Sequence, residues 1–303
     1  MSLFPGFEAR RIDAGEVTIS CVVGGAGPPV LLLHGYPQTH AMWHRVALRL
    51  AERFTVVAAD LRGYGASDKP AGARGHQNYS KRVMAQDQVR VMESLGYDRF
   101  RVVGHDRGGR VAHRMALDHA ARVERIAVLD IAPTRTMYMR TDRVFAQAYY
   151  HWFFLIQPAP FPERLIGSDP DYVLRWHLGS RHAGLSRFDP RALEEYAQAF
   201  RDPATIHATC EDYRAAATID LEHDSADLDR RIEAPLLVLW GRHGVIQRCF
   251  HPIEDWAERA NDVSGRALDC GHYLAEEAPT ETAEELVRFL ADSGKGKGEG
   301  GSG

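Results

Sequence analysis

The sequence predicts an α/β fold, in which helices flank a mostly parallel sheet and a helical segment interrupts the chain. Short β-branched or leucine-rich runs alternate with amphipathic stretches through the first half of the sequence. The strand-like runs then disappear between residues 134 and 227, where aromatic residues, Pro and Gly are frequent. A buried strand pattern, "APLLVLWG", and a closing helix pattern, "TAEELVRFLAD", follow that segment. These three observations indicate one sheet domain with a helical insertion.

The predicted elements follow one another in a regular order. Amphipathic helices are expected over two stretches that lie between strands, Ser80–Leu95 and Arg107–His119. Residues 1–133 and 228–292 are assigned to the sheet domain, residues 134–227 to a helical cap, and residues 293–303 to a flexible low-complexity tail. The strands expected from their composition are Val17–Val23, Pro29–Leu33, Phe54–Ala59, Phe100–Val103 and Ile126–Asp130.

Composition narrows the class of protein. The 303 residues are 45% hydrophobic and 26% charged, which predicts a substantial core rather than a disordered chain. The formal net charge of −4 gives no reason to expect nucleic acid or an anionic membrane as a partner. The four cysteines form no Cys-x-x-Cys pair, the first residues lack a signal-peptide pattern, and no apolar run is long enough to span a bilayer. We expect a soluble, cytoplasmic enzyme.

The stretch "VVGHDRGGRV" is the main candidate for a catalytic motif. It is typical of a sharp turn from a strand into a helix, where small residues must flank a nucleophile because the backbone is closely packed. Gly104, Gly108 and Gly109 stand at the required offsets around Asp106. At the start of a helix, an ionised carboxylate is stabilised and can attack without a base. The alternative is that Asp106 only caps the following helix.

Two further loops resemble parts of such a site. "LLLHGYPQT" follows a buried strand, and we expect the backbone N–H groups of Tyr36 and Arg107 to form an oxyanion hole. A simple turn is the alternative for this loop. "DLRGYGASDKP" contains Ser67, which could be a serine nucleophile, but no strand enters that loop directly.

A general base and an orienting acid are also expected. "LDCGHYLAEEAP" places His272 between an apparent strand and the last helix, where it can activate water. The loop after "PLLVLWGRHGV" has no carboxylate in the usual place for the orienting acid. "VLDIAP" instead places Asp130 at the carboxyl end of the preceding strand, where it can orient His272. The alternative for Asp130 is to cap a helix of the insertion.

Taken together, several motifs resemble the fluoroacetate dehalogenases, a family of the α/β-hydrolase superfamily. The resemblance covers nearly the whole chain. It implies an α/β-hydrolase fold and hydrolytic dehalogenation of a small anionic haloacid, with fluoroacetate giving glycolate and fluoride. It also implies a homodimer and no cofactor. The residues that carry it are His34–Pro37, "GHDRGGR", "LDIAP", "YYHWFF", "CEDYRA" and "CGHYL".

The resemblance assigns roles to two arginines and three donors. Arg107 and Arg110 match positions that bind the substrate carboxylate, and their spacing places them on one face of the helix start. The alternative is that they pair with acids on the surface. Three further residues match positions that donate hydrogen bonds to the departing halide: His151, Trp152 and Tyr213. Without the resemblance, "YYHWFF" is an aromatic core of the cap.

Two positions differ from the family pattern. Tyr36 stands where many relatives have phenylalanine, and Ser180 occupies a position where relatives often have tryptophan. These differences are expected to affect the pocket size and the halide preference. His40 and His44 have the spacing of metal ligands on a helix, but no third ligand is evident, so we expect no metal. An epoxide hydrolase with the same Asp-His machinery, in which Tyr213 activates the epoxide, and a non-catalytic ligand receptor are the alternative functions.

Overall fold

An eight-stranded sheet runs through the protein, whose computed structural model describes residues 2–292. Its strand order is β1-β2-β4-β3-β5-β6-β7-β8. The six strands from β4 to β8 in this order are parallel, whereas β1 and β2 are antiparallel to their neighbours. The strands are β1 (Glu8–Asp13), β2 (Thr18–Gly24), β3 (Pro29–Leu33), β4 (Thr55–Ala59), β5 (Phe100–His105), β6 (Val123–Leu129), β7 (Leu236–Gly241) and β8 (Val263–Leu268).

The predicted mostly parallel sheet with flanking helices is therefore confirmed. The five strands predicted with bounds are all present, and the longest shifts of an end are two or three residues. β1 has no counterpart in the sequence prediction. Five of its six side chains are exposed, so it lacks the alternation of buried and exposed residues that marks most strands. The strand pairs antiparallel with β2 at the edge of the sheet.

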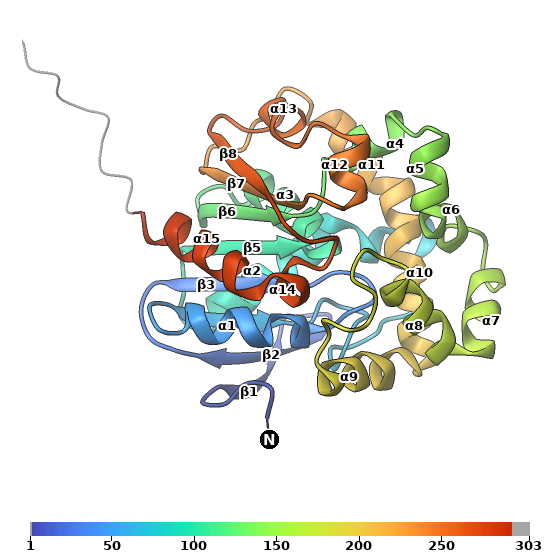
Figure 1. Cartoon of the computed structure of the whole chain (residues 1–303), viewed down its shortest axis with the longest axis horizontal. Coiled ribbons are helices and arrows are strands. Elements are labelled where there is room, and N and C mark those ends of the chain that lie inside the picture. The colour runs from blue at the N-terminus through green and yellow to red at the C-terminus, as the bar shows by residue number, and fades with distance from the viewer. Residues whose placement is uncertain (1, 293–303) are drawn as a thin grey trace, which may run out of the picture.

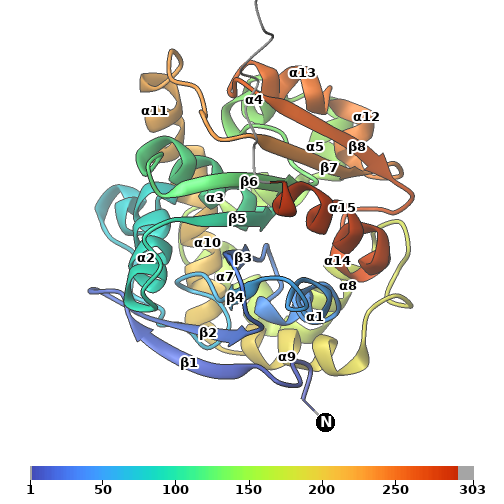
Figure 2. The same cartoon turned by 90° about the vertical axis from the view of Figure 1, so that its left-hand side faces the viewer.

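Helices cover both faces of this sheet. α2 and α3 pack on one face, and α1 and α15 pack together on the other (Figure 2). The N-cap of α2 is Ser80, whose hydroxyl accepts a hydrogen bond from Val83 N. The helices outside the insertion are η1 (His40–Trp43), α1 (His44–Leu50), η2 (Arg74–Tyr79), α2 (Lys81–Ser94), α3 (Arg107–Asp118), α12 (Val245–Cys249), α13 (Pro252–Ala257), α14 (Leu274–Glu277) and α15 (Pro279–Ala291).

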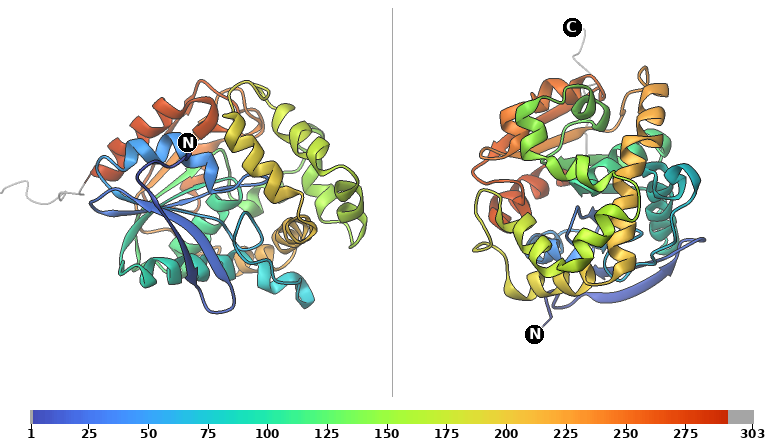
Figure 3. Two further views of the ribbon diagram at one scale, coloured as in Figure 1. Left: turned by 90° about the horizontal axis from the view of Figure 1, so that it is seen from below. Right: turned by 90° about the vertical axis from the view of Figure 1, so that its right-hand side faces the viewer.

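Eight helices lie between β6 and β7 in the chain and form the helical insertion. They gather beyond the carboxyl ends of the central parallel strands, on the right in Figure 1 and facing the viewer in the right-hand view of Figure 3. Three of them begin with an Asp-Pro pair, whose aspartate accepts a backbone hydrogen bond. They are α4 (Thr134–Met139), α5 (Arg143–Ala148), α6 (Tyr150–Leu155), α7 (Phe161–Ser168), α8 (Pro170–Gly179), α9 (Pro190–Phe200), α10 (Pro203–Ala217) and α11 (Ile219–Ala226).

This arrangement positions the functional residues. The carboxyl ends of β5 and β6 both face the helical insertion (Figure 1), and the central strand β3 is buried along almost its whole length. Side chains that follow these strands therefore lie between the sheet and the inserted helices. Within residues 2–292, no helix combines the length and the apolar character needed to cross a bilayer.

Candidate active site

The turn from β5 into α3 carries Asp106 at the centre of the site. Asp106 has φ 47° and ψ −112°, a conformation that is rare for residues other than glycine and that often marks functional sites. Its side chain makes no capping hydrogen bond to α3, so the helix-cap interpretation of this residue is wrong. Instead, its Oδ1 accepts a hydrogen bond of 3.0 Å from Tyr36 N, one of the two predicted oxyanion donors. The other, Arg107 N, begins α3 and belongs to the first turn, whose N–H groups have no partner within the helix.

The glycines around this turn are required by close backbone contacts. A Cβ at Gly108 would lie 2.4 Å from Leu33 O, and a Cβ at Gly104 would lie 2.4 Å from Gly108 O. A Cβ at Gly35 would lie 2.4 Å from the Cβ of Asp106 itself. The small residues therefore let β3, β5 and α3 approach closely enough to raise the Asp106 carboxylate between Gly35 and the helix start.

Asp106 is ionised despite being only 3% exposed. Burial by itself would raise the pKa of its carboxyl group. Interactions with His272 in its charged form and with Arg107 outweigh burial and lower that pKa to about 2. The carboxylate is therefore available as a nucleophile throughout the neutral range, without a base to deprotonate it.

This ionisation predicts a pH-independent first step. With chloroacetate, the initial halide burst of a His272→Asn variant should keep a constant rate as the pH falls from 8 to about 5, because Arg107 and Arg110 still favour the ionised form of Asp106 once the charge of His272 is removed. Stopped-flow measurement of halide release at each pH checks this expectation, with the fold followed by circular dichroism. A burst rate that halves between pH 7 and pH 5 in a folded variant would contradict it.

His272 and Asp130, the predicted base and orienting acid, lie in direct contact. His272 Nδ1 lies 2.6 Å from Asp130 Oδ2, and the second carboxylate oxygen of Asp130 accepts a hydrogen bond of 2.9 Å from Gly241 N. Asp130 is fully buried, so these bonds fix its orientation and that of the His272 ring. Asp130 thus supplies the carboxylate that the loop after β7 lacks, and Gly241 N, at the end of β7, holds it in place. The helix-cap alternative for Asp130 is wrong, because both oxygens are engaged elsewhere.

His105 and Tyr149 complete the surroundings of His272. The His105 ring lies 4.7 Å from the His272 ring, and its Nε2 is 2.8 Å from His272 O. Burial, reinforced by the charge of His272, lowers the pKa of His105 to about 3, which keeps this ring neutral. The Tyr149 ring lies edge-on to His272 at 6.4 Å. Sequence reasoning missed both residues, although His105 directly precedes the predicted nucleophile.

Arg107 and Arg110 are buried rather than paired with acids on the surface. Arg107 is 0% and Arg110 is 2% exposed, which excludes the surface-pair alternative. Arg107 donates from Nε and Nη2 to the carboxylate of Asp212 at 2.9 and 2.7 Å, and its guanidinium stacks over the Tyr213 ring at 4.1 Å. Its remaining nitrogen, Nη1, is buried and has no hydrogen-bond partner in the described chain.

Arg110 differs from Arg107 because no carboxylate of residues 2–292 forms an ion pair with it. Its Nη1 donates to Thr134 Oγ1 at 2.9 Å, and its guanidinium lies 4.7 Å from the centre of the Trp152 ring. Its Nε is buried without a partner. Burial, followed by repulsion from Arg107, lowers the pKa of Arg110. A buried cation without a carboxylate is costly, so this position favours an anionic ligand.

The three predicted halide donors come together on the helical insertion. His151 and Trp152 lie on α6, Tyr213 lies on α10, and the Tyr213 ring is 5.9 and 6.3 Å from the other two. His151 Nδ1 and Trp152 Nε1 are buried without partners in the described chain. Burial lowers the pKa of His151 and raises that of Tyr213, so the ring is neutral and the hydroxyl keeps its proton. The group also packs as an aromatic core, as the alternative interpretation of "YYHWFF" expects, and its role as a halide donor stays a prediction.

The site adjoins two cavities in the described chain. One, of about 490 Å³, is lined by His272, Tyr149, Ser180, Arg181 and Arg248, and no Asp or Glu of residues 2–292 lines it. The other, of about 250 Å³, is mostly apolar and is lined by residues that include Tyr36, His151 and His177. The two positions that differ from the family pattern, Tyr36 and Ser180, therefore each line one cavity. Asp106, the predicted nucleophile, lines neither cavity and is almost fully buried.

The remaining sequence candidates have structural partners. Ser67 Oγ donates to Asp60 O and accepts from Ser20 N, which leaves this hydroxyl within a loop and away from Asp106. His40 Nδ1 lies 2.9 Å from Asp60 Oδ1, and His44 Nδ1 lies 2.9 Å from Ala41 O. Within residues 2–292, no group of three or more His, Cys, Asp or Glu side chains is placed to hold a metal ion.

The fold and this site define an α/β-hydrolase, and residues 28–279 match the family described as alpha/beta hydrolase fold. A fluoroacetate dehalogenase from a Burkholderia sp. is 52% identical over 295 residues, which cover 97% of each chain. The chain therefore belongs to the fluoroacetate dehalogenase family.

Two other proteins are also similar to this chain. An α/β-hydrolase from Nostoc sp. PCC 7120, known from a crystal structure, is 60% identical in sequence to this chain. The two structures superpose with a TM-score of 0.93, and the match covers 94% of this chain and 98% of that one. A soluble epoxide hydrolase from Corynebacterium sp. (strain C12) is 33% identical over 89% of this chain and 92% of its own. The similarity to epoxide hydrolases leaves that activity as the alternative to be tested.

Proposed function

We propose that the protein is a haloacetate dehalogenase and that fluoroacetate is among its substrates. In the first step, an Oδ atom of Asp106 attacks the α-carbon of the haloacetate. The carbon–halogen bond breaks, and its electron pair leaves with the halide. The product of this step is a carboxymethyl ester of Asp106. The buried Arg110, which has no carboxylate partner of its own, is the observation that carries this proposal, because the substrate carboxylate supplies that partner.

The second step regenerates the nucleophile. His272, oriented by Asp130, takes a proton from water, and the resulting hydroxide attacks Cγ of Asp106. The N–H of Tyr36 stabilises the oxygen that gains negative charge, since it already donates to Asp106 Oδ1 at 3.0 Å. Collapse of this intermediate breaks the ester bond, and the departing alkoxide takes the proton from His272 to give glycolate. The Asp106 carboxylic acid that forms loses its proton to solvent, which returns the carboxylate. No step requires a metal or an organic cofactor.

The helical insertion acts as the cap of this site in our proposal. It supplies His151, Trp152 and Tyr213, whose N–H and O–H groups stabilise the departing halide. This support matters most for fluoride, which carries its charge on a small atom and leaves reluctantly. The 490 Å³ cavity favours an anionic substrate as well, because it contains Arg181 and Arg248 and no lining carboxylate among residues 2–292. The homodimer and the cytoplasmic location stay predictions.

The direct test measures fluoride release from fluoroacetate and chloride release from chloroacetate side by side with ion-selective electrodes. We expect both halides, with glycolate in equal amount. Chloride without fluoride would keep the nucleophile and the arginines but reject the donors on the insertion as a fluoride site. Release of neither halide would reject the proposed function.

Epoxide hydrolysis is the second candidate, favoured by the 33% identity to the Corynebacterium enzyme. Styrene oxide and epichlorohydrin serve as probes in the same preparation. We expect little turnover of these neutral molecules, because they leave the buried charge of Arg110 without a counter-ion. Diol formation without any halide release from haloacetates would select the epoxide hydrolase instead.

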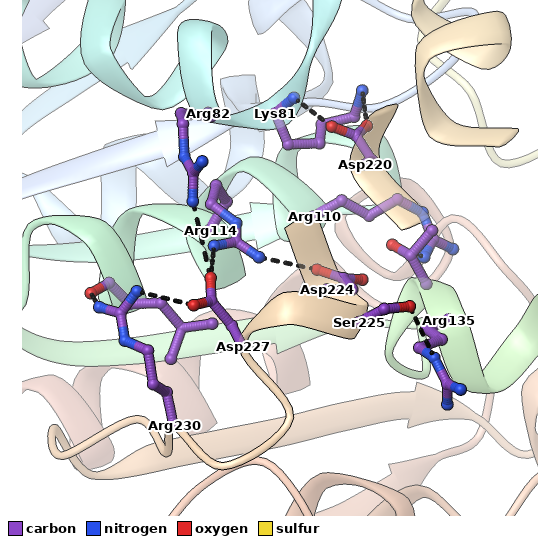
Figure 4. Close-up of polar contacts among 12 residues, drawn as sticks. Lys81, Arg82, Arg110, Arg114, Arg135, Asp220, Asp224, Ser225, Asp227 and Arg230 are labelled. Carbon is purple, nitrogen blue, oxygen red and sulfur yellow. Dashed lines mark hydrogen bonds and ion pairs between the residues drawn. The ribbon is translucent and has the colours of Figure 1, made fainter. Parts of the chain in front are cut away.

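The unpaired arginine makes a further prediction. Arg110→Met is expected to lower kcat/KM for chloroacetate by about 10²–10³-fold, mainly through KM, because the substrate loses its charged hydrogen-bond partner. Arg135→Met is the matched control, since Arg135 lies on α4 and donates to Ser225 Oγ at 3.1 Å instead (Figure 4). Steady-state kinetics of both variants checks the expectation, and equal losses in the two would contradict it.

A further inference from the structure

Within the described chain, the hydrogen bonds of the Arg107 guanidinium all go to Asp212 of the helical insertion, next to Tyr213, over whose ring the guanidinium stacks. Arg107 Nε donates to Asp212 Oδ2 at 2.9 Å, and Nη2 donates both to Asp212 Oδ1 at 2.7 Å and to Asp212 O at 2.9 Å. The two residues lie 105 positions apart in the sequence, on α3 and α10, and both are fully buried. These bonds leave Nη1 as the nitrogen of Arg107 that has no partner in the described chain.

Asp212 is itself held by two residues of the sheet domain. Lys81 Nζ donates to Asp212 Oδ1, and the hydroxyl of Tyr64 donates to Asp212 Oδ2 at 2.7 Å. Lys81 is in turn fixed by Asp220 on α11, which lies 3.4 Å from Nζ and also accepts from Lys81 N at 2.8 Å (Figure 4). Arg107 and Lys81 outweigh the effect of burial and lower the pKa of Asp212, so its carboxylate stays ionised.

Lys81 also changes the charge balance around Arg107. With Arg107 alone, Asp212 would neutralise the guanidinium and weaken its attraction for a second carboxylate. Lys81, on the other side of Asp212, competes with Arg107 for this anion, and Asp220 in turn pairs with Lys81, so the buried group holds two cations and two carboxylates. The hydrogen bonds thus fix the orientation of Arg107 and leave its Nη1 as the donor available for another anion.

We propose that Asp212, supported by Lys81 and Tyr64, is a positioning residue that aligns Arg107 to bind the substrate carboxylate through Nη1. The inference rests on the proposed function and explains how the site selects substrates that carry a carboxylate. An arginine side chain has many rotamers, so ordering it on substrate binding costs conformational entropy. Fixing one rotamer before the substrate arrives removes this cost from the free energy of binding. A carboxylate held at the wrong place also moves the α-carbon away from Asp106, and a shift of about 1 Å can cost about 10²-fold in rate.

The test compares two acid-to-amide variants. Asp212→Asn is expected to raise KM for chloroacetate and the Kd for acetate, a carboxylate that carries no leaving group, by about tenfold or more. Asp224→Asn is the matched control, because Asp224 is also buried and accepts from Arg114 Nη2 at 2.9 Å, in a cluster beside the Lys81–Asp220 pair (Figure 4). We expect the control to change both constants by less than about twofold, since it makes no contact with Arg107.

Two more variants separate positioning from a purely structural role. Tyr64→Phe removes one uncharged donor to Asp212, so it should fold and raise both constants by a smaller factor of about two to five. In an Arg107→Met background, Asp212→Asn should weaken acetate binding no further, because Asp212 acts through Arg107. An equal further loss in that background, or unchanged constants in both Asp212→Asn and Tyr64→Phe, would overturn the inference.

Failure of the proposed function can be told apart from failure of this inference. Acetate titration by calorimetry needs no dehalogenation, so it reports on Arg107 even if the wild type releases no halide. Halide release with acetate affinity unaffected by Asp212→Asn would leave the function standing and reject the positioning role. Loss of acetate binding in that variant, without halide release from the wild type, would support the positioning role of Asp212 and reject the proposed function.

Discussion

Asp106→Asn is expected to reduce halide release from both fluoroacetate and chloroacetate by at least about 10⁴-fold, to the level of the blank. The neutral amide is a poor nucleophile, and the ester cannot form. The pocket should otherwise be unchanged, because Asn keeps an oxygen that can accept from Tyr36 N. Ion-selective electrodes measure the loss, and acetate titration checks that the carboxylate still binds.

The control for this substitution is Asp118→Asn, which lies on the same helix. Asp118 accepts from Arg82 Nε at 2.7 Å, and we expect its variant to keep wild-type kcat. Peptide mass spectrometry must accompany the Asp106→Asn assay, since deamidation of the new asparagine would restore the nucleophile. Sustained turnover in a preparation free of deamidated chain would remove Asp106 from the mechanism.

His272→Asn should separate the two steps of the reaction. The ester should still form, because Asp106 needs no base, but its hydrolysis should slow by about 10³–10⁴-fold. We expect release of one halide per chain, followed by a stop, and a peptide containing Asp106 that carries one added carboxymethyl group. The stop is what distinguishes a histidine that activates water from one that only shapes the pocket.

A double variant provides the control for this trapping experiment. Asp106→Asn combined with His272→Asn should give neither the halide burst nor the carboxymethyl adduct, because no nucleophile remains. Multiple turnovers in the single His272→Asn variant, or an adduct on another residue, would show that a different group activates water or attacks the substrate.

Much of the fold was predictable because its central strands are local features of the sequence. The runs that form β3 and β5 are buried almost throughout; the run of β3 is apolar without a break, and that of β5 is centred on Val102 and Val103. The edge strand β1 was not predictable in the same way. β1 consists mostly of exposed polar side chains, and only its pairing with β2 makes it a strand.

The residues of the candidate site differ in the same way: some form a local sequence motif, and others meet only in the folded chain. Asp106 and its glycines form one continuous motif, so the turn could be identified from sequence spacing alone. Asp212 and Lys81, by contrast, are 131 residues apart and meet only when α10 packs against the start of α2. No local pattern marks such a pair. The motif "CEDYRA" contains Asp212 beside the predicted halide donor Tyr213, and this adjacency was the one available signal.

The division of the site between two parts of the chain has a consequence for how its chemistry can change. Asp106 and His272 come from the sheet domain, whereas His151, Trp152 and Tyr213 all come from the helical insertion between β6 and β7. In the proposed mechanism, the attacking group and the groups that receive the leaving atom can therefore vary independently during evolution. Exchange of the insertion for that of a relative should retune the choice of leaving group while ester formation stays intact, provided that the new helices bring an acid to the position of Asp212.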